Sequence, residues 1–220
     1  MRALSILEAR LLGVLIEKAS TVPDSYPLSL NTLMLGCNQK TARDPVLNTC
    51  EAEVQDAVLA LKALHLVFEA SGSRVTRFEH NAGRAMALPS QSVALLATLV
   101  LRGPQTVSEL RTASERLHRF ADLSSVEGFL DELAARADDK GGALVVKLPR
   151  APGAREPRWA HLICGAVDVA AMPVASDSDD FIAASEIAAL KARQAAMQAS
   201  LDELRGLVER LCAELGVVRG

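Results

Sequence analysis

The pattern of apolar and polar positions in residues 49–79 changes from the period of a helix to that of strands. Apolar residues first recur every three or four positions, as on the buried face of an amphipathic helix. They are Val54, Ala57, Val58, Leu61 and Leu64. Apolar and polar residues then alternate on both sides of a serine–glycine stretch at 71–73, which favours a turn between two strands. The segment therefore predicts a helix followed by a β-hairpin, the second half of a winged helix-turn-helix.

Two further helices are predicted before this segment. Apolar residues at helical spacing predict the first near residues 4–19. Ser29 can cap the second, at Leu30–Cys37. Prolines interrupt the stretch between them, which we expect to be a loop. The polar stretch 38–45 ends in a proline and is typical of an ordered loop.

The same pattern returns later in the chain. Apolar positions in 93–100 match those in 9–16 at an offset of 84, and those in 126–133 match 54–61 at an offset of 72. Repetition of this kind indicates two copies of one structural unit. Because the offset shrinks along the chain, the first copy must carry extra residues in its inter-helix loops.

The second copy also has its own helix starts and hairpin. Capping-box patterns beginning at Thr106 and at Ser124 predict two helix N-termini. Apolar stretches on either side of a long loop predict a hairpin within 144–163. We therefore expect a mainly helical α+β protein with two winged-helix domains in tandem, at residues 1–86 and 87–165.

The C-terminal part has a different composition. Residues 166–220 hold nine acidic and five basic residues, and we expect an acidic linker at 166–184. A helix at 185–216 carries apolar residues every 3.5 positions, the period of a coiled coil. The candidate association residues are Leu190, Met197, Leu201, Leu204, Val208 and Leu211. We favour pairing with a second chain or a partner helix; the alternative is that the helix packs back on its own domains.

The composition excludes several other classes. The four cysteines are scattered without a C-x-x-C pair, so we expect reduced thiols and no disulfide framework or zinc site. No apolar run is long enough for a membrane span, which favours a soluble, cytoplasmic protein without membrane contacts. The net charge is −3 with 24 basic and 27 acidic residues, an unusual balance for a protein that depends on phosphate contacts.

The expected groove-facing helices argue against conventional reading of DNA. A helix that enters the major groove usually offers arginine, lysine, asparagine or glutamine to the bases. The third helix of each copy is instead mainly acidic. The first offers Glu51, Glu53, Gln55, Asp56 and Lys62, and the second offers Glu127, Asp131, Glu132 and Arg136. A basic binding patch could form from the polar loop and the first hairpin: Asn38, Gln39, Lys40, Arg43, Arg74 and Arg77. The alternative is that these side chains hold the backbone of their own loop.

No motif supplies catalytic chemistry. The four histidines have no convincing partners, and there is no phosphate-binding P-loop or G-x-G-x-x-G sequence. Because no motif provides both a nucleophile and a base, we expect no enzymatic activity, no cofactor and no metal.

Several motifs resemble those of the bacterial YceH family. They include C-N-Q-K at Cys37–Lys40, R-D-P at 43–45, E-A-E-V-Q at 51–55 and L-R-G-P-Q-T at 101–106. The similarity covers residues 4–215 and implies a tandem winged-helix fold with a C-terminal helix. It assigns no activity, substrate or catalytic residue. One departure is Cys50, which stands where a serine cap is expected; a thiol caps poorly, so Thr49 could replace it.

Together these observations predict a non-enzymatic interaction or regulatory module, with a protein adaptor as the favoured interpretation. The alternative is a DNA-binding transcriptional regulator that uses its hairpins and the loop from Asn38 to Arg43.

Overall fold

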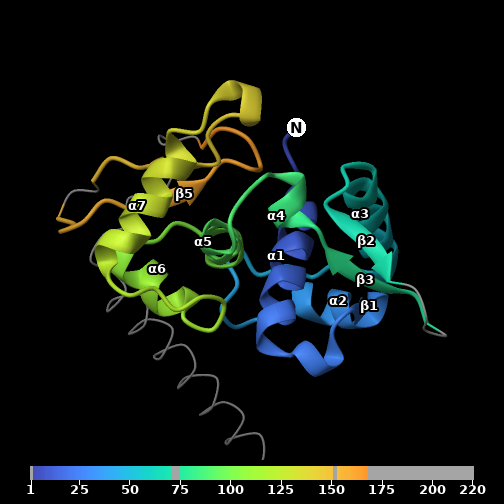
Figure 1. Ribbon diagram of the computed structural model, residues 1–220. Coiled ribbons are helices and arrows are strands. Elements are labelled where there is room, and N and C mark those ends of the chain that lie inside the picture. Colours follow the sequence, from blue (N-terminus) through green and yellow to red (C-terminus); the bar gives the residue numbers. More distant parts are fainter. Residues whose placement is uncertain (1, 71–74, 151–152, 168–220) are drawn as a thin grey trace, which may run out of the picture. The chain divides into compact units, whose positions relative to one another are not determined.

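The computed structural model describes residues 2–70, 75–150 and 153–167 (Figure 1). Residues 2–150 and 155–167 belong to one compact unit. The helix predicted at 185–216 and nearly all of the predicted linker lie outside the described residues. Within the described ranges, no helix is long and apolar enough to cross a membrane.

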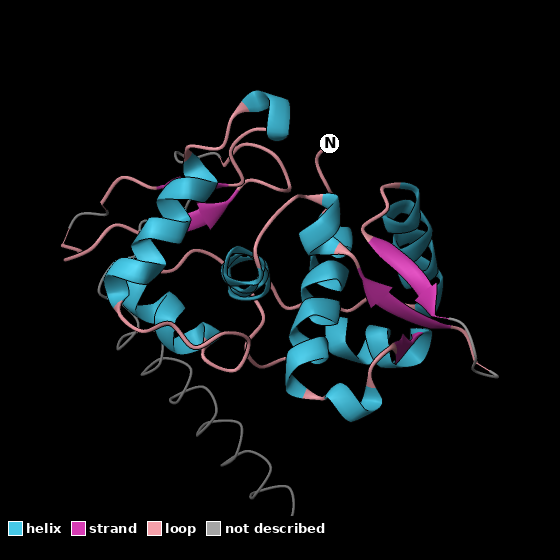
Figure 2. Ribbon diagram, viewed as in Figure 1, coloured by secondary structure: helices cyan, strands magenta, loops and turns pink. Residues whose placement is uncertain are grey.

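The described chain has the same order of elements twice, in residues 2–86 (the first half) and in residues 87–167 (the second half). The first half contains α1 (Ile6–Thr21), the 3₁₀ turn η1 (Pro23–Ser25), β1 (Leu28–Ser29), α2 (Leu30–Cys37), α3 (Glu51–Ala63), β2 (Val67–Ala70), β3 (Arg77–His80) and α4 (Ala82–Ala85). The second half contains α5 (Ser90–Arg102), α6 (Val107–Ser114), α7 (Leu123–Ala134), η2 (Asp138–Lys140), β4 (Val145–Lys147) and β5 (Trp159–His161). Each half thus contains three helices followed by a hairpin, to which the first half adds β1 and α4, in a mixed α+β arrangement (Figure 2).

Side-chain caps decide where several helices begin. Ser5 and Glu8 form a capping box, so α1 starts two residues later than predicted. Thr106 forms the predicted box at the start of α6, where its Oγ1 accepts from Glu109 N at 3.2 Å. The box predicted at Ser124 is wrong. Asp122 caps α7 instead, because its carboxylate accepts from Ser125 N at 2.7 Å.

The start of α3 relies on a carboxylate rather than on the thiol. Glu53 Oε2 accepts from Cys50 N at 2.8 Å and from Thr49 Oγ1 at 2.8 Å. Glu53 therefore reaches back to the N-cap residue, as in a capping box. An acidic group at this end also suits the positive end of the helix dipole, and these hydrogen bonds lower the pKa of Glu53.

Two small antiparallel sheets complete the fold. The first has strand order β1-β3-β2 and the second pairs β4 with β5. Sequence analysis missed β1, a two-residue strand that places Leu28 opposite Phe78. The hairpins match in register, because Val67 lies opposite His80 in the first and Val145 opposite His161 in the second.

The two halves share one core. Helices α1 and α5 pack on each other at the centre, with the sheets on either side (Figures 1 and 2). A single cluster of buried, mostly aliphatic residues runs through both halves, from Leu11 and Leu15 to Leu95 and Leu99. The approach is close, because a Cβ atom on Gly13 would lie 3.0 Å from Leu101 Cγ. The two halves therefore do not have separate hydrophobic cores joined by a linker.

Candidate interaction groove

Arg43, predicted as part of a basic surface patch, is buried. Its side chain is 0% exposed and forms a two-pronged ion pair with Glu17 of α1, with Nη2–Oε2 at 2.6 Å and Nη1–Oε1 at 3.2 Å. It also donates to the Gly36 and Ala42 carbonyls. Burial alone would raise the pKa of Glu17, but Arg43 and Lys18 bring it below its ordinary value. The charge of Arg43 is thus used inside the protein.

Two other loop residues stabilise the same connection. Asn38 Nδ2 donates to Thr49 O at 2.8 Å, and Asn38 Oδ1 accepts from Thr49 N at 2.7 Å. Gln39 Oε1 accepts from Arg43 Nη2 at 3.2 Å. Lys40 is exposed and has no ion-pair partner within the described residues. The loop therefore holds its own backbone, the alternative reading of these residues.

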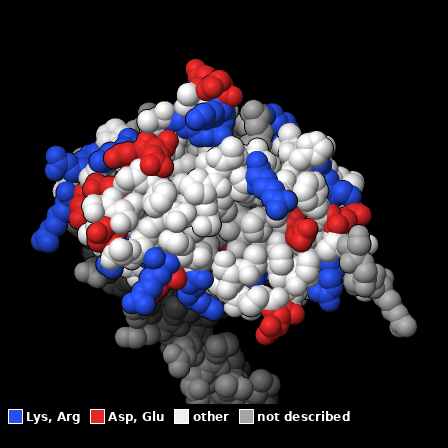
Figure 3. Space-filling view, in the orientation of Figure 1, with Lys and Arg blue, Asp and Glu red and all other residues white. Residues whose placement is uncertain are grey.

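The hairpin arginines do not complete a basic stripe. Arg77 is half-buried, and its Nη1 donates to Pro27 O at 2.8 Å and to Ser25 O at 3.3 Å. Arg74 lies outside the described residues. On the face shown in Figure 3, basic and acidic side chains are interspersed. Of the predicted patch, Lys40 is the described cation that remains at the surface.

A groove lies where the N-termini of α2 and α3 meet the first hairpin. It has a volume of about 400 Å³. The lining residues are Ser29, Leu30, Asn31, Glu51, Gln55, Glu69, Val75, Thr76 and Phe78. Phe78 is buried at 3% exposure, whereas Val75 is 58% exposed. The groove therefore combines apolar surface with polar hydrogen-bonding groups.

The charges of this groove are negative. Glu51 and Glu69 line it, and none of its lining residues that the structure describes is a lysine or arginine. Lys62 forms an ion pair with the partly exposed Glu69 and offsets part of its charge. Glu51 has no ion-pair partner among the residues that the structure describes. Phosphate groups would meet unfavourable charge here, whereas a cationic ligand would meet favourable charge.

The structure also reveals features that sequence analysis missed. In the second half, Arg116 and Arg119 are exposed in the connection between α6 and α7. The last residues of β3 and β5, His80 and His161, occupy matching positions and each has a buried Nδ1 without a hydrogen-bond partner. Burial lowers the pKa of both, that of His161 to about 4. Each histidine ends the returning strand of its half's hairpin, and that shared place in the repeat was the available signal.

The described cysteines form no metal cluster. Cys37 is buried, Cys50 exposed and Cys164 half-buried, and all three are free thiols. Burial raises the pKa of Cys37 to about 11, so this thiol stays protonated. Within the described ranges, no group of three or more histidine, cysteine or acidic side chains could hold a metal ion.

Comparison with known proteins places the chain in a family. The model described as "Protein of unknown function, DUF480" matches residues 4–154. The chain belongs to this family. A UPF0502 protein of Leptothrix cholodnii is 59% identical over 219 residues, covering 98% of this chain and 97% of that protein. A UPF0502 protein of Burkholderia pseudomallei is 60% identical over 217 residues, covering 99% of this chain and 91% of that protein.

A UPF0502 protein of Paraburkholderia phytofirmans is also similar, at 58% identity over 220 residues, covering 100% of this chain and 92% of that protein. The similarity extends over the full described structure and beyond it. The expected membership of a bacterial protein family is thus confirmed, while the YceH name and the winged-helix fold that it implies remain predictions.

Proposed function

We propose that the chain is a non-enzymatic interaction module built on two winged helices, whose first helix–hairpin groove binds a basic segment of a partner protein. The groove lined by Glu51 and Glu69, with no lysine or arginine among its described lining residues, carries this proposal. A segment with lysine or arginine beside apolar residues would match both the carboxylates and the apolar walls. Coiled-coil pairing through residues 185–216 would then supply avidity, since linked sites bind more tightly than single ones.

The order of elements supports the winged-helix interpretation. In that fold the third helix and the hairpin form the face that contacts ligands. Here α3 exposes Glu51, Glu53 and Asp56, and α7 exposes Glu127, Asp131 and Glu132. A face of this charge suits a cationic protein segment better than a nucleic-acid backbone.

A peptide titration tests the proposal. The probe is a labelled peptide of alternating lysine and leucine, compared with the same peptide carrying glutamate for lysine and with a short DNA duplex. We expect the basic peptide to bind more tightly than both. The double variant Glu51→Lys/Glu69→Lys should weaken basic-peptide binding by roughly tenfold, since two close charge pairs become repulsive.

Asp131→Lys is the matched control, because it makes a similar change on the exposed face of α7, outside the groove. It should leave peptide binding in the first half almost unchanged. Equal loss in this control would attribute the binding to net charge and overturn the groove assignment. Tighter binding of the duplex than of the basic peptide would favour DNA.

A DNA-binding regulator is the second candidate, and one observation favours it. The connection between α6 and α7 exposes Arg116 and Arg119, neither of which has an ion-pair partner among the described residues. These side chains could contact phosphates even though the helix that follows is acidic. This candidate predicts binding that weakens steeply with salt and that depends on the second half.

A further inference from the structure

A second hollow lies where the two halves meet. It has a volume of about 470 Å³, within the range of small-molecule sites. Its walls come from α1, the end of β3, α4, α5 and the residue Leu117 after α6. The apolar lining residues are Ile16, Leu88, Val93, Ala94 and Leu117. A ligand in this cavity would therefore contact both halves at once.

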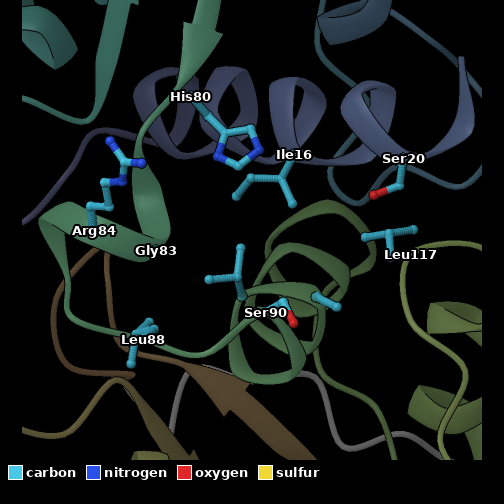
Figure 4. A pocket seen from close by; sticks show the side chains of 10 residues that line it. Ile16, Ser20, His80, Gly83, Arg84, Leu88, Ser90 and Leu117 are labelled. Carbon is cyan, nitrogen blue, oxygen red and sulfur yellow. The ribbon is translucent and has the colours of Figure 1, made fainter. Parts of the chain in front are cut away.

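Polar groups enter the cavity at only a few points. His80 and Ile16 point into it, with Arg84 on one side and Ser20 and Leu117 on the other (Figure 4). The Nδ1 atom of His80 is buried and has no hydrogen-bond partner in the described protein. A buried polar atom without a partner is costly and uncommon. The ring that carries it forms part of the cavity wall, so it is the polar group that a ligand would meet at the inner end.

The charge at the cavity comes from one side chain. Arg84 is exposed and forms no ion pair within the described residues. Burial lowers the pKa of His80, so its ring is neutral at pH 7 and adds no second positive charge. No acidic residue is among the described residues that line the cavity. One guanidinium at the edge of an apolar cavity favours a ligand with one anionic end and an apolar body.

We propose that this cavity is a binding site for a small amphipathic carboxylate. The apolar body lies between Ile16, Val93 and Leu117, and the carboxylate pairs with Arg84. The neutral His80 ring hydrogen-bonds to the ligand at the inner wall. This site is independent of the groove at α3, so either assignment can fail without the other.

A panel of three chain-matched probes tests the charge preference. Octanoate, octanamide and octylamine share one apolar body and differ in the charge of the polar end. Calorimetry with the full chain should show binding of octanoate at millimolar concentration or below, with octanamide roughly threefold weaker and octylamine weaker still, since one exposed charge pair contributes modestly. No binding of octanoate, or equal binding of octanoate and octylamine, would overturn the assignment.

Two variants locate the site. Arg84→Gln should remove the preference for octanoate over octanamide while keeping binding of the neutral probe. Ser20→Phe should abolish binding of all three, because it fills the cavity from an exposed position on α1 without entering the core. Arg102→Gln, an exposed arginine outside the cavity, is the matched control and should change nothing. Thermal melting establishes that each variant is folded.

The two histidines give a readout independent of affinity. On addition of octanoate, the imidazole nitrogen shifts of His80 should move, while those of His161, its counterpart in the second hairpin, should not. Unchanged shifts of His80 with octanoate bound would place the ligand elsewhere and contradict the proposal. Retained octanoate binding in folded Ser20→Phe would do the same.

Discussion

The two halves of the molecule place the arginines of the same connection differently. Between α2 and α3, Arg43 points inward and its side chain is 0% exposed. Between α6 and α7, Arg116 and Arg119 are exposed. The first connection is also longer, as the shrinking offsets of the sequence repeat require.

The longer connection, residues 38–50, joins helices to one another rather than offering a binding surface, and is called the brace below. Arg10 of α1, 1% exposed, reaches it from the core and donates from Nη2 to Pro45 O at 2.6 Å. Asp44 N donates to Leu101 O at 2.8 Å, which ties the loop to α5 in the second half. Charged residues in an inserted loop thus join three helices, and basic character in the sequence did not translate into basic surface.

The strongest test of the brace is to remove its buried cation. Arg43→Met should lower the free energy of unfolding by about 3 kcal/mol, because Glu17 keeps a largely buried charge and loses its closest partner, leaving only the longer ion pair with Lys18. Chemical denaturation measures this. Lys40→Met, an exposed residue of the same loop, is the matched control and should change stability by roughly 0.5 kcal/mol or less. Similar small effects for both variants would show that the ion pair does not stabilise the fold.

A second test concerns the pH dependence of stability that the buried His161 of the second hairpin produces. His161 has a folded pKa of about 4, below its ordinary 6.5, so the unfolded chain binds more protons between these values. Stability is therefore fully present above pH 6.5 and falls as the pH drops toward 4, by roughly 2–3 kcal/mol from this residue. His161→Leu should flatten that part of the profile, measured by denaturation at several pH values.

His65→Asn is the control for that experiment. His65 is exposed with a φ of 57°, a conformation that asparagine tolerates. The stability of the His65→Asn variant should depend on pH in the same way as that of the wild type. An acid profile that stays as steep in His161→Leu as in the wild type would assign the loss to other groups.

Helix caps and the buried Arg43 show which parts of the fold and of the candidate site the sequence could predict. The box of Thr106 was predicted because its hydrogen-bond partner, Glu109, lies three residues away. The box at Ser124 was wrong because Asp122 offers a carboxylate acceptor two residues earlier. The burial of Arg43 depends on Glu17, 26 residues away in sequence, and no local pattern reports such a contact. The groove and the cavity likewise depend on tertiary packing.

Alanine should have opposite effects on stability at two glycines, one at the contact between the brace and α5 and the other on the open surface of α7. Gly103 has a φ of +74°, and a Cβ there would lie 2.5 Å from Asp44 Oδ2. Gly103→Ala should therefore destabilise the protein by roughly 1–2 kcal/mol through strain and displacement of Asp44. Gly128→Ala on α7 meets nothing within 4 Å and should stabilise by about 0.5–1 kcal/mol. Thermal melting of both variants measures the two changes in stability. A Gly103→Ala variant as stable as the wild type would contradict the close approach of Asp44 to Gly103.

The smallest expected effect concerns nucleic acid and follows from where the cations lie. Binding to random duplex DNA should be weak at physiological salt, because both third helices are acidic. At low salt, anisotropy titrations should show that Arg116→Gln/Arg119→Gln reduces the slope of log affinity against log salt by about two, one for each lost phosphate contact. Arg77→Gln should leave that slope unchanged, because its guanidinium already donates to Pro27 O and Ser25 O. Submicromolar binding that depends on Arg77 would reverse the comparison, since it would mean that the first half, despite its buried Arg43, provides the DNA-binding surface.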